Sequence, residues 1–240
     1  MINQKERLDK SNVDVLILCG GRGTRFEEVS ENKPKALATI NGVPLIDLVI
    51  ERLEKQGFKS FILAVGFRKD KIVDHFNGSQ KNISFSEETS PLGTGGAIKN
   101  AKSYLKSGYF IVMNGDLLCE MNYEDLIESH LNKDALLTLT VSKADKTEDY
   151  GNIVLDNEHY VSSFSEKKST TKSDYVSAGT YIMDKNIFKF FPSEKAFSLE
   201  IDFFEKNTVM INTHIIDKSF LDIGTPERFK KANLINKNRE

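Results

Sequence analysis

Bare glycine backbone and cationic side chains occur together near the N-terminus. Residues 20–25 read GGRGTR and follow an apolar run. Glycine lets backbone N–H groups approach phosphate oxygens closely, and the planar guanidinium of Arg25 offers phosphate a fork of donors. Further along, Pro34 stiffens the chain beside Lys35, a second cation. Each feature alone also fits a plain turn or a solvated lysine, but the combination favours a polyphosphate site.

A carboxylate follows a predicted buried strand later in the chain. Asp116 closes the tripeptide Asn-Gly-Asp directly after the apolar residues 110–113. A carboxylate at a strand end suits a hard cation, and Mg²⁺ usually takes one or two carboxylates together with phosphate oxygens. Asp116 is therefore a candidate metal ligand, and the alternative is an ordinary turn residue.

The spacing of the glycines excludes two common phosphate-binding motifs. The chain contains no G-x-x-x-x-G-K-[ST], and residues 20–25 do not fit G-x-G-x-x-G. The acidic ribose-binding residue of dinucleotide enzymes is also missing after the second predicted strand, where Gly66, Phe67 and Arg68 stand. A dinucleotide-dependent oxidoreductase is therefore disfavoured.

The elements that must position these residues alternate between strand and helix in the first half of the chain. Predicted strands are 13–19, 61–65, 83–86, 110–113 and 135–142, and predicted helices are 44–56, 69–76, 94–105 and 123–131. Short apolar runs followed by helices indicate a parallel sheet buried on both faces. Ligands of such α/β sheets bind beyond the carboxyl ends of the strands, where residues 20–25 and Asp116 fall.

The second half has a different pattern. Short strands are predicted at 152–155, 160–165, 178–183 and 213–216, with helical stretches at 185–191 and 199–206 and a last helix from Pro226. The predicted fold is therefore α/β, a mostly parallel sheet flanked by helices, with an α+β portion laid against it. No linker divides the chain, so we predict a flexible N-terminal arm at 1–12 and one domain at 13–240.

Composition limits the protein class. The chain has 240 residues and a formal net charge of −2, whereas a nucleic-acid-binding surface usually needs a strong basic excess. No apolar run reaches the roughly 20 residues needed to span a bilayer, and the polar start lacks a signal-peptide core. We therefore expect a cytoplasmic protein with no nucleic-acid or membrane partner. Cys19 and Cys119 are expected to be buried free thiols.

A family resemblance joins these motifs. G-G-x-G-T-R followed by P-K resembles the signature of the nucleotidylyltransferases that make nucleoside-diphosphate sugars, and further motifs extend the resemblance along nearly the whole chain. It implies a Rossmann-like, GT-A-like fold with a nucleotide-binding portion at 13–142 and a sugar-binding portion at 143–240. It also implies Mg²⁺ as cofactor, and a nucleoside triphosphate and a sugar 1-phosphate as substrates.

The resemblance implies a nucleotide-binding set built on two glycine loops. Residues 91–97 (PLGTGGA) look like the family's second loop, which holds base and ribose, and small residues there would let a flat base lie on the backbone. The implied nucleotide-binding residues are Leu18, Gly20, Gly21, Gly23, Thr24, Arg25, Glu88, Pro91, Gly93, Thr94 and Gly115.

Motifs of the second half are similar to those that hold sugar and metal in the family. The implied sugar-phosphate-binding residues are Asn114, Tyr150, Gly151, Glu166, Lys167, Ala178 and Gly179. The closing D-I-G-T-P-E makes Asp222 a second metal ligand beside Asp116. The implied catalytic residues are Arg25, Lys35, Asp116 and Lys167. Ser177 stands where the family usually has asparagine, a departure that bears on which sugar fits.

The resemblance is strongest to the short guanylyltransferases that act on D-glycero-D-manno-heptose 1-phosphate. The shared features are the first glycine loop, Glu88 with the second loop, and residues 196–200 (AFSLE). GTP and a heptose 1-phosphate are therefore the expected substrates, and surface polysaccharide synthesis the expected use. Uridylyl or cytidylyl transfer to another sugar phosphate is the alternative, and a catalytically inactive regulatory subunit is the alternative of another class. Dimers are common among such proteins, so a homodimer is compatible with the sequence.

Overall fold

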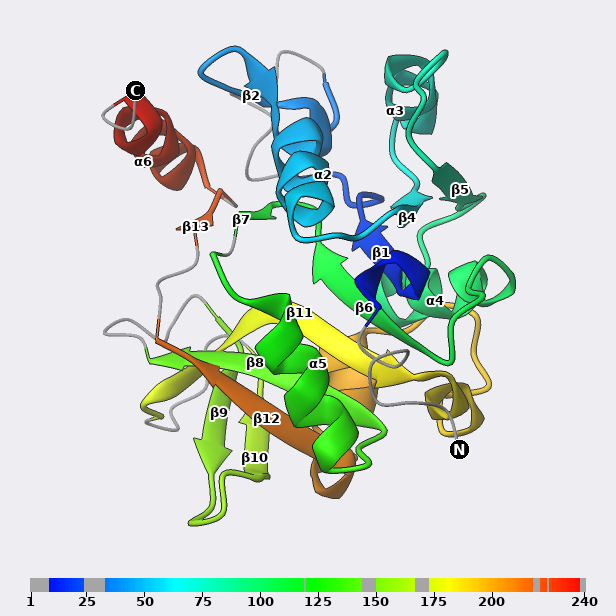
Figure 1. Cartoon of the computed structure of the whole chain (residues 1–240). Helices are drawn as coiled ribbons and strands as arrows, with labels where there is room; N and C mark the ends of the chain where they lie inside the picture. The colour runs from blue at the N-terminus through cyan, green and yellow to red at the C-terminus, as the bar shows by residue number, and fades with distance from the viewer. Residues whose placement is uncertain are drawn as a thin grey trace.

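The computed structural model describes residues 9–23, 33–118, 120–143, 150–166, 173–217, 221–223 and 225–237, without the side chains of 221, 222 and 235–237. A mixed nine-stranded sheet runs through the molecule (Figure 1). Its first part is parallel: β1 (Asp14–Leu18) lies between β4 (Ser60–Val65) and β6 (Tyr109–Asn114), and β5 (Ile83–Glu87) lies beyond β4. The predicted α/β class with a parallel first half is therefore confirmed.

The second part of the sheet is mostly antiparallel. Strand β11 (Tyr175–Asp184) pairs with β6, with β8 (Leu137–Lys143) and with β9 (Asn152–Leu155). Strand β10 (Val161–Ser165) borders β9, and β12 (Ile211–Ile216) runs parallel to β8. The register of β11 against β8 shifts between Ser177 and Tyr181, and such a bulge re-aims the side chains around it.

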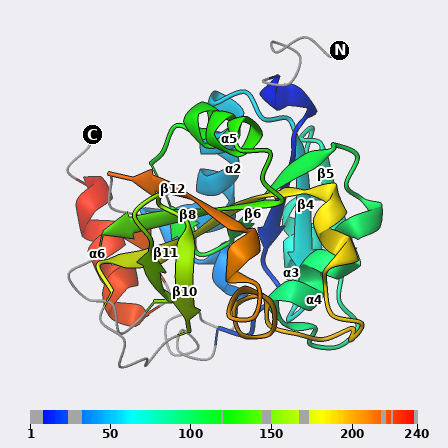
Figure 2. The same ribbon diagram turned by 90° about the horizontal axis from the view of Figure 1, so that it is seen from below.

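Helices cover both faces of the sheet (Figure 2). The face that carries Val15 and Ile17 packs against α2 (Leu45–Lys55), α3 (Lys69–His75) and α5 (Tyr123–Asn132). The opposite face packs against α4 (Gly93–Asn100), the 3₁₀ segments η4 (Ala101–Ser103) and η5 (Lys185–Lys189), and the π-helical turn η6 (Leu199–Phe204). Helix α6 (Pro226–Lys237) ends the described chain. None of the helices within the described ranges is long and apolar enough to cross a bilayer.

Helix α2 forms because its apolar residues recur at helical intervals. Leu45, Ile46, Val49, Ile50 and Leu53 are buried on one side, as expected for a helix that lies on a sheet. Pro44, predicted as its first residue, instead ends β3 (Val43–Pro44). Strand β3 pairs with β2 (Thr39–Ile40), and the turn between them places two consecutive residues at positive φ, as a type I′ hairpin requires. The prediction did not include this hairpin.

Two predicted helical stretches of the second half have other hydrogen-bond patterns. Of the predicted stretch 185–191, Lys185–Lys189 form the 3₁₀ segment η5, and the Asp184 side chain caps it by accepting from Asn186 N. Of the predicted stretch 199–206, Leu199–Phe204 form the π-turn η6, where the Ser198 hydroxyl accepts from Ile201 N. A short 3₁₀ segment, η7 (Thr208–Met210), follows before β12.

Buried hydrogen bonds fix the end of β1 that lies away from its glycine loop. The Asp14 carboxylate accepts from Ser60 Oγ at 2.7 Å, from Lys106 N at 2.5 Å and from Ser107 N at 2.8 Å. Asp14 therefore joins β1 to β4 and to the segment before β6. Of the predicted arm, residues 9–12 include the 3₁₀ turn η1 (Lys10–Asn12), and Lys10 pairs with Glu124 on α5.

Candidate active site

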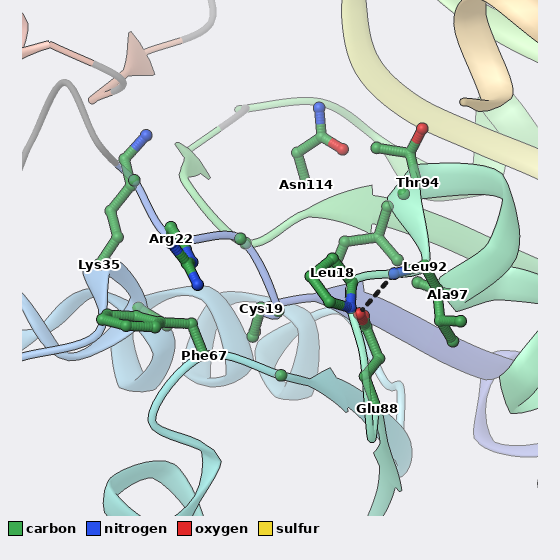
Figure 3. Close-up of a pocket in the computed structure, with 18 of the residues that line it drawn as sticks. Leu18, Cys19, Arg22, Lys35, Phe67, Glu88, Leu92, Thr94, Ala97 and Asn114 are labelled. Atoms are coloured by element: carbon green, nitrogen blue, oxygen red, sulfur yellow. Dashed lines mark hydrogen bonds between the residues drawn. The ribbon is translucent and has the colours of Figure 1, made fainter. Parts of the chain in front are cut away.

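A cavity of about 620 Å³ opens beyond the carboxyl ends of β1, β4 and β6 (Figure 3). This is the position at which α/β sheets bind ligands. The cavity is lined by segments that follow four strands and by the 3₁₀ turn η3 (Lys35–Leu37). Predicted site residues in its lining are Leu18, Gly20, Gly21, Gly23, Lys35, Glu88, Pro91, Gly93, Thr94, Asn114, Gly115 and Asp116.

Close backbone approach explains Gly20 and Gly115. A Cβ on Gly20 would lie 2.6 Å from Glu88 Oε1, and one on Gly115 would lie 2.8 Å from the Leu18 carbonyl oxygen. Phe67 N donates to the Gly20 carbonyl at 3.1 Å, and Gly115 N donates to the Leu18 carbonyl at 3.0 Å. These bonds fix the loops after β4 and β6 to the end of β1. At Gly21, which lines the cavity, a Cβ would meet nothing within 4 Å.

Glu88 brings a carboxylate into the cavity between the two glycine loops. Its Oε2 accepts from Leu92 N at 3.2 Å, the dashed line in Figure 3. Burial raises the pKa of Glu88, and the hydrogen bond from Leu92 only partly offsets this effect. The charged carboxylate is therefore poorly solvated, and additional hydrogen-bond donors from a ligand would stabilise it.

The second glycine loop owes two of its glycines to packing rather than to a ligand. A Cβ on Gly95 would collide with the Phe197 ring, and one on Gly96 with the Lys195 carbonyl. The N–H groups of both residues donate to the Phe197 carbonyl, at 3.1 and 3.2 Å. The expectation that these small residues leave room for a base therefore does not explain them; they allow residues 195–198 to lie against α4.

Lys35 and Asp116 form an ion pair at the cavity wall. Pro34 precedes the 3₁₀ turn η3, and Lys35 begins it, so the rigid turn sets the direction of the lysine. The Asp116 side chain is 33% exposed, which leaves it accessible from the cavity. Burial, and secondarily the charge of Asp116, raise the pKa of the neighbouring Cys19 thiol to about 12. Cys19 is thus a buried free thiol, as predicted.

The chain brings Asp222 beside Asp116 through a short antiparallel ladder. Strand β13 (Leu221–Asp222) pairs with β7 (Leu117–Leu118), and Asp222 stands opposite Leu117 (Figure 1). Ile223 N also donates to the Asp116 carbonyl oxygen at 3.1 Å. The backbones of the two predicted metal ligands therefore converge across more than a hundred residues of sequence. Hard carboxylate donors at these positions suit Mg²⁺, although no cluster of three metal-ligating side chains occurs among the residues described.

Four of the residues predicted to bind the sugar phosphate lie in two neighbouring pairs. Gly179 has φ +62°, and a Cβ there would overlap the Leu117 side chain and lie 2.9 Å from Asn114 Nδ2. A Cβ on Gly151 would lie only 2.8 Å from Phe164 Cζ, and it would lie 3.5 Å from Glu166 Oε2. Glycine is therefore required at 179 for backbone conformation and at both positions for space.

Tyr150 and Ala178 occupy different surroundings from those four residues. The Arg228 guanidinium of α6 lies 4.7 Å from the centre of the Tyr150 ring. Ala178 is fully buried in the core on the α2 side of the sheet, so only its backbone is available to a ligand.

Comparison with known proteins identifies the family. Residues 14–239 match the family model described as nucleotidyl transferase. The chain belongs to the nucleotidyl transferase family. The D-glycero-alpha-D-manno-heptose 1-phosphate guanylyltransferase of Campylobacter jejuni is 34% identical, over 90% of this chain and 97% of that protein. Its namesake from Aneurinibacillus thermoaerophilus is 33% identical, over 92% and 96%.

Solved structures agree with this nucleotidyl transferase in fold. The crystal structure of HddC from Yersinia pseudotuberculosis has a TM-score of 0.83 at 37% identity and covers 93% of this chain and 99% of that one. A second structure of HddC, complexed with GMP-PN, has a TM-score of 0.82 with the same coverage. Enzymes of the nucleotidyl transferase family generally use a divalent metal.

Some predicted residues of this nucleotidyl transferase lie outside the described residues. They are Thr24, Arg25, Lys167 and the side chain of Asp222, together with Cys119. Their roles stay predictions from the family resemblance.

The sequence prediction missed a cation and an aromatic ring in the cavity. Arg22 and Phe67 both line it, and the Arg22 guanidinium lies 6.0 Å from the centre of the Phe67 ring (Figure 3). Arg68 lies 5.2 Å from the same ring. Arg22 belongs to the first glycine loop, and this position in the sequence could have indicated that its side chain lines the cavity. Phe67 follows the second strand, and only the pairing of β1 with β4 brings it to the loop.

Proposed function

We propose that this nucleotidyl transferase transfers a guanylyl group from GTP to D-glycero-α-D-manno-heptose 1-phosphate and releases pyrophosphate. The observation that carries the proposal is the similarity, over nearly full length, to proteins named for this reaction, joined with the HddC structure that holds GMP-PN. The cavity lies beyond the carboxyl ends of the parallel strands, where α/β sheets bind ligands, and has the size of a small-ligand site.

Glu88 supports the choice of a purine with two donors on one edge. Guanine presents its ring N1–H and its exocyclic amino group side by side, and a carboxylate accepts both. Glu88 Oε2 already accepts one hydrogen bond from Leu92 N, but a carboxylate has about four acceptor positions, so further capacity remains. In this role the guanine donors would supply the solvation that burial removes from Glu88.

Lys35, Asp116 and the first glycine loop support the phosphate chemistry. The reaction joins two anions and expels a third, so the site mainly has to neutralise charge and align the reactants. We assign the backbone of residues 20–23, with Arg25, to the β- and γ-phosphates, and Lys35 to the charge near the α-phosphate. Lys35 leaves its ion pair with Asp116 when a polyphosphate competes for it. The attacking sugar phosphate is already ionised near neutral pH, so a general base is not required.

Asp116 and Asp222 are the residues that would hold Mg²⁺. When bound there, the ion would supply positive charge to the phosphate oxygens. Asp116 lies at the wall of the cavity, and the β7–β13 ladder brings the Asp222 backbone next to it. On the sugar side, we assign the pairs Asn114–Gly179 and Gly151–Glu166 to the sugar, and Lys167 to its phosphate.

A pyrophosphate-release assay tests the proposal. The purified protein is given GTP, UTP, CTP or ATP, each with heptose 1-phosphate, mannose 1-phosphate or glucose 1-phosphate, and with Mg²⁺ or EDTA. We expect the highest kcat/KM for GTP with the heptose phosphate, and loss of turnover in EDTA. A higher kcat/KM with another nucleotide or sugar would replace the substrate assignment. Absence of turnover with every pair would instead favour a binding or regulatory subunit.

A further inference from the structure

The Lys35 ammonium lies against the carboxylate that we assign to the metal. Lys35 Nζ pairs with Asp116 Oδ2, and both residues line the cavity. The lysine side chain is 15% exposed and the aspartate side chain 33% exposed, so solvent screens the pair only in part. An ammonium and a divalent cation at one carboxylate repel each other. In this position Lys35 therefore opposes the binding of a divalent cation by Asp116.

The backbone around Lys35 is fixed by the 3₁₀ turn η3. Leu37 N donates to the Pro34 carbonyl oxygen at 2.8 Å, and Ala38 N donates to the Lys35 carbonyl oxygen at 3.0 Å. Ala36, the central residue of the turn, is buried in the core. The movable part of Lys35 is therefore its flexible four-carbon stem, which carries the ammonium as a compact point charge.

The backbone of Asp116 is fixed from two sides. Gly115 N donates to the Leu18 carbonyl oxygen at 3.0 Å, and Ile223 N donates to the Asp116 carbonyl oxygen at 3.1 Å. Ile223 is itself fully buried. The carboxylate therefore stays at the cavity wall, and the ion pair can open by rotation of the lysine side chain without any change of the backbone.

Charge in the cavity favours this opening when a polyphosphate enters. Among the described residues of the lining, two cations, Arg22 and Lys35, balance two carboxylates, Glu88 and Asp116. A triphosphate adds several negative charges, and lysine is a common phosphate ligand. The Lys35 ammonium is then drawn from Asp116 to the phosphate. The freed carboxylate and the phosphate oxygens together are the hard ligands that Mg²⁺ takes.

We propose that Lys35 is a competitor for the metal ligand Asp116, which it neutralises in the empty enzyme and releases when a nucleoside triphosphate binds. The inference rests on the proposed function, in which Asp116 holds the metal and Lys35 binds phosphate. It goes further, because it makes the affinity for a divalent cation depend on the nucleotide. Linkage makes this coupling reciprocal: the cation strengthens nucleotide binding by the same factor.

A metal titration of the nucleotide-free protein tests the proposal without any turnover. Mn²⁺ is the probe, and electron paramagnetic resonance measures the free ion. We expect Lys35→Met to lower the Kd for Mn²⁺ about fivefold or more, the lower end of the usual coupling between two sites. Lys35→Arg keeps the positive charge and should bind Mn²⁺ as weakly as the wild type. Lys35→Met combined with Asp116→Asn should lose the gain, which would locate the ion at Asp116.

A second ion pair of the same kind provides the matched control. Lys81 pairs with Glu54, with side chains 30% and 35% exposed, and neither residue lines the cavity. Lys81→Met thus removes one positive charge and frees one carboxylate, as Lys35→Met does, and its Kd for Mn²⁺ should equal that of the wild type. Thermal melting should show that every variant is folded. No gain in folded Lys35→Met, or an equal gain in Lys81→Met, would overturn the proposal.

The exchange itself can be observed in a crystal structure of the wild type with GTP in EDTA. We expect the Lys35 ammonium to contact a phosphate oxygen and to lie beyond about 4 Å from Asp116, the limit of an ion pair. A bound nucleotide with the Lys35–Asp116 pair intact would contradict the release step.

These measurements separate the inference from the proposed function. The Mn²⁺ titration contains neither nucleotide nor sugar, so its result does not depend on which substrates the enzyme uses. If the pyrophosphate-release assay shows a preference for another nucleotide or sugar, the substrate assignment fails, while a gain in Lys35→Met still supports the competition. If the wild type uses GTP and heptose 1-phosphate with Mg²⁺ but Lys35→Met gains no affinity for Mn²⁺, the inference fails and the proposed function stands.

Discussion

The two sides of the candidate active site, which we assign to the nucleotide and to the sugar, use different parts of the chain. On the nucleotide side, the ends of parallel strands present backbone: Gly20, Gly21 and Gly115 stand where side chains would collide or block access. On the sugar side, a bulged antiparallel strand presents side chains such as Ser177. A backbone site can hold a phosphate chain common to many nucleotides, whereas a side-chain site can change with one substitution.

The largest predicted effect on turnover is at Asp116, which lies between the nucleotide side and the sugar side. Asp116→Asn should lower kcat by roughly 10²- to 10³-fold, as expected when one electrostatic stabiliser is removed. It also takes the negative partner from Lys35. Initial rates of pyrophosphate release at saturating substrates measure the effect. Asp70→Asn, an exposed change on α3, is the control. Near-normal turnover in Asp116→Asn would remove the metal assignment.

A pair of adjacent glycines tests whether the nucleotide side depends on backbone space. Gly20→Ala places a Cβ 2.6 Å from Glu88 Oε1, whereas Gly21→Ala meets nothing within 4 Å. Overpacking of this kind costs about 1–3 kcal/mol of folding free energy, so Gly20→Ala should melt at a lower temperature, and displacement of the Glu88 carboxylate should raise KM for GTP. Gly21→Ala should keep the wild-type melting temperature, and any rise in its KM for GTP then reports contact with the ligand. Equal melting temperatures for both variants would contradict the packing argument.

Glu88→Gln tests the one side chain that we assign to base recognition. KM for GTP should rise about tenfold, since hydrogen bonds to charged groups contribute roughly 1.5–3 kcal/mol, and the preference for GTP should weaken. The same variant should be more stable than the wild type near neutral pH, although it binds GTP more weakly. The folded-state pKa of Glu88 lies above its ordinary value of 4.5, so the wild type loses stability as pH rises from 4.5 through that pKa. Denaturant unfolding at several pH values should show that the variant lacks this loss.

Arg22→Gln should have the smallest effect of the four. Arg22 lines the cavity beside Phe67, and an exposed cation contributes about 0.5–1 kcal/mol. We therefore expect a two- to fivefold rise in KM for GTP that disappears at high salt. Arg52→Gln on α2 is the matched control, because its partner is Glu120 outside the cavity. A rise of the same size in both variants would point to the net charge of the protein rather than to the site.

Prediction from the sequence succeeded where local patterns decide structure. The apolar run before Gly20 gave β1, and the spacing of Leu45, Ile46, Val49 and Ile50 gave α2. The prediction failed where contacts between segments far apart in the sequence determine the structure. The small residues of 91–97 are expected from the sequence to make room for a base, but Gly95 and Gly96 are explained by segment 195–198, which folds against α4 from the other half of the chain.

The sequence by itself determined the alternation of strands and helices, the two glycine loops, and the acidic residues that a divalent cation needs. These are short-range patterns that residue types and spacing specify. Only the tertiary structure determined which of these residues lie next to one another. The pairing of β13 with β7 puts Asp222 next to Asp116, and the bulge in β11 sets Ser177 between Gly151 and Gly179. Such contacts depend on how strands that are far apart in the sequence pair and in which register, and no local sequence pattern encodes this.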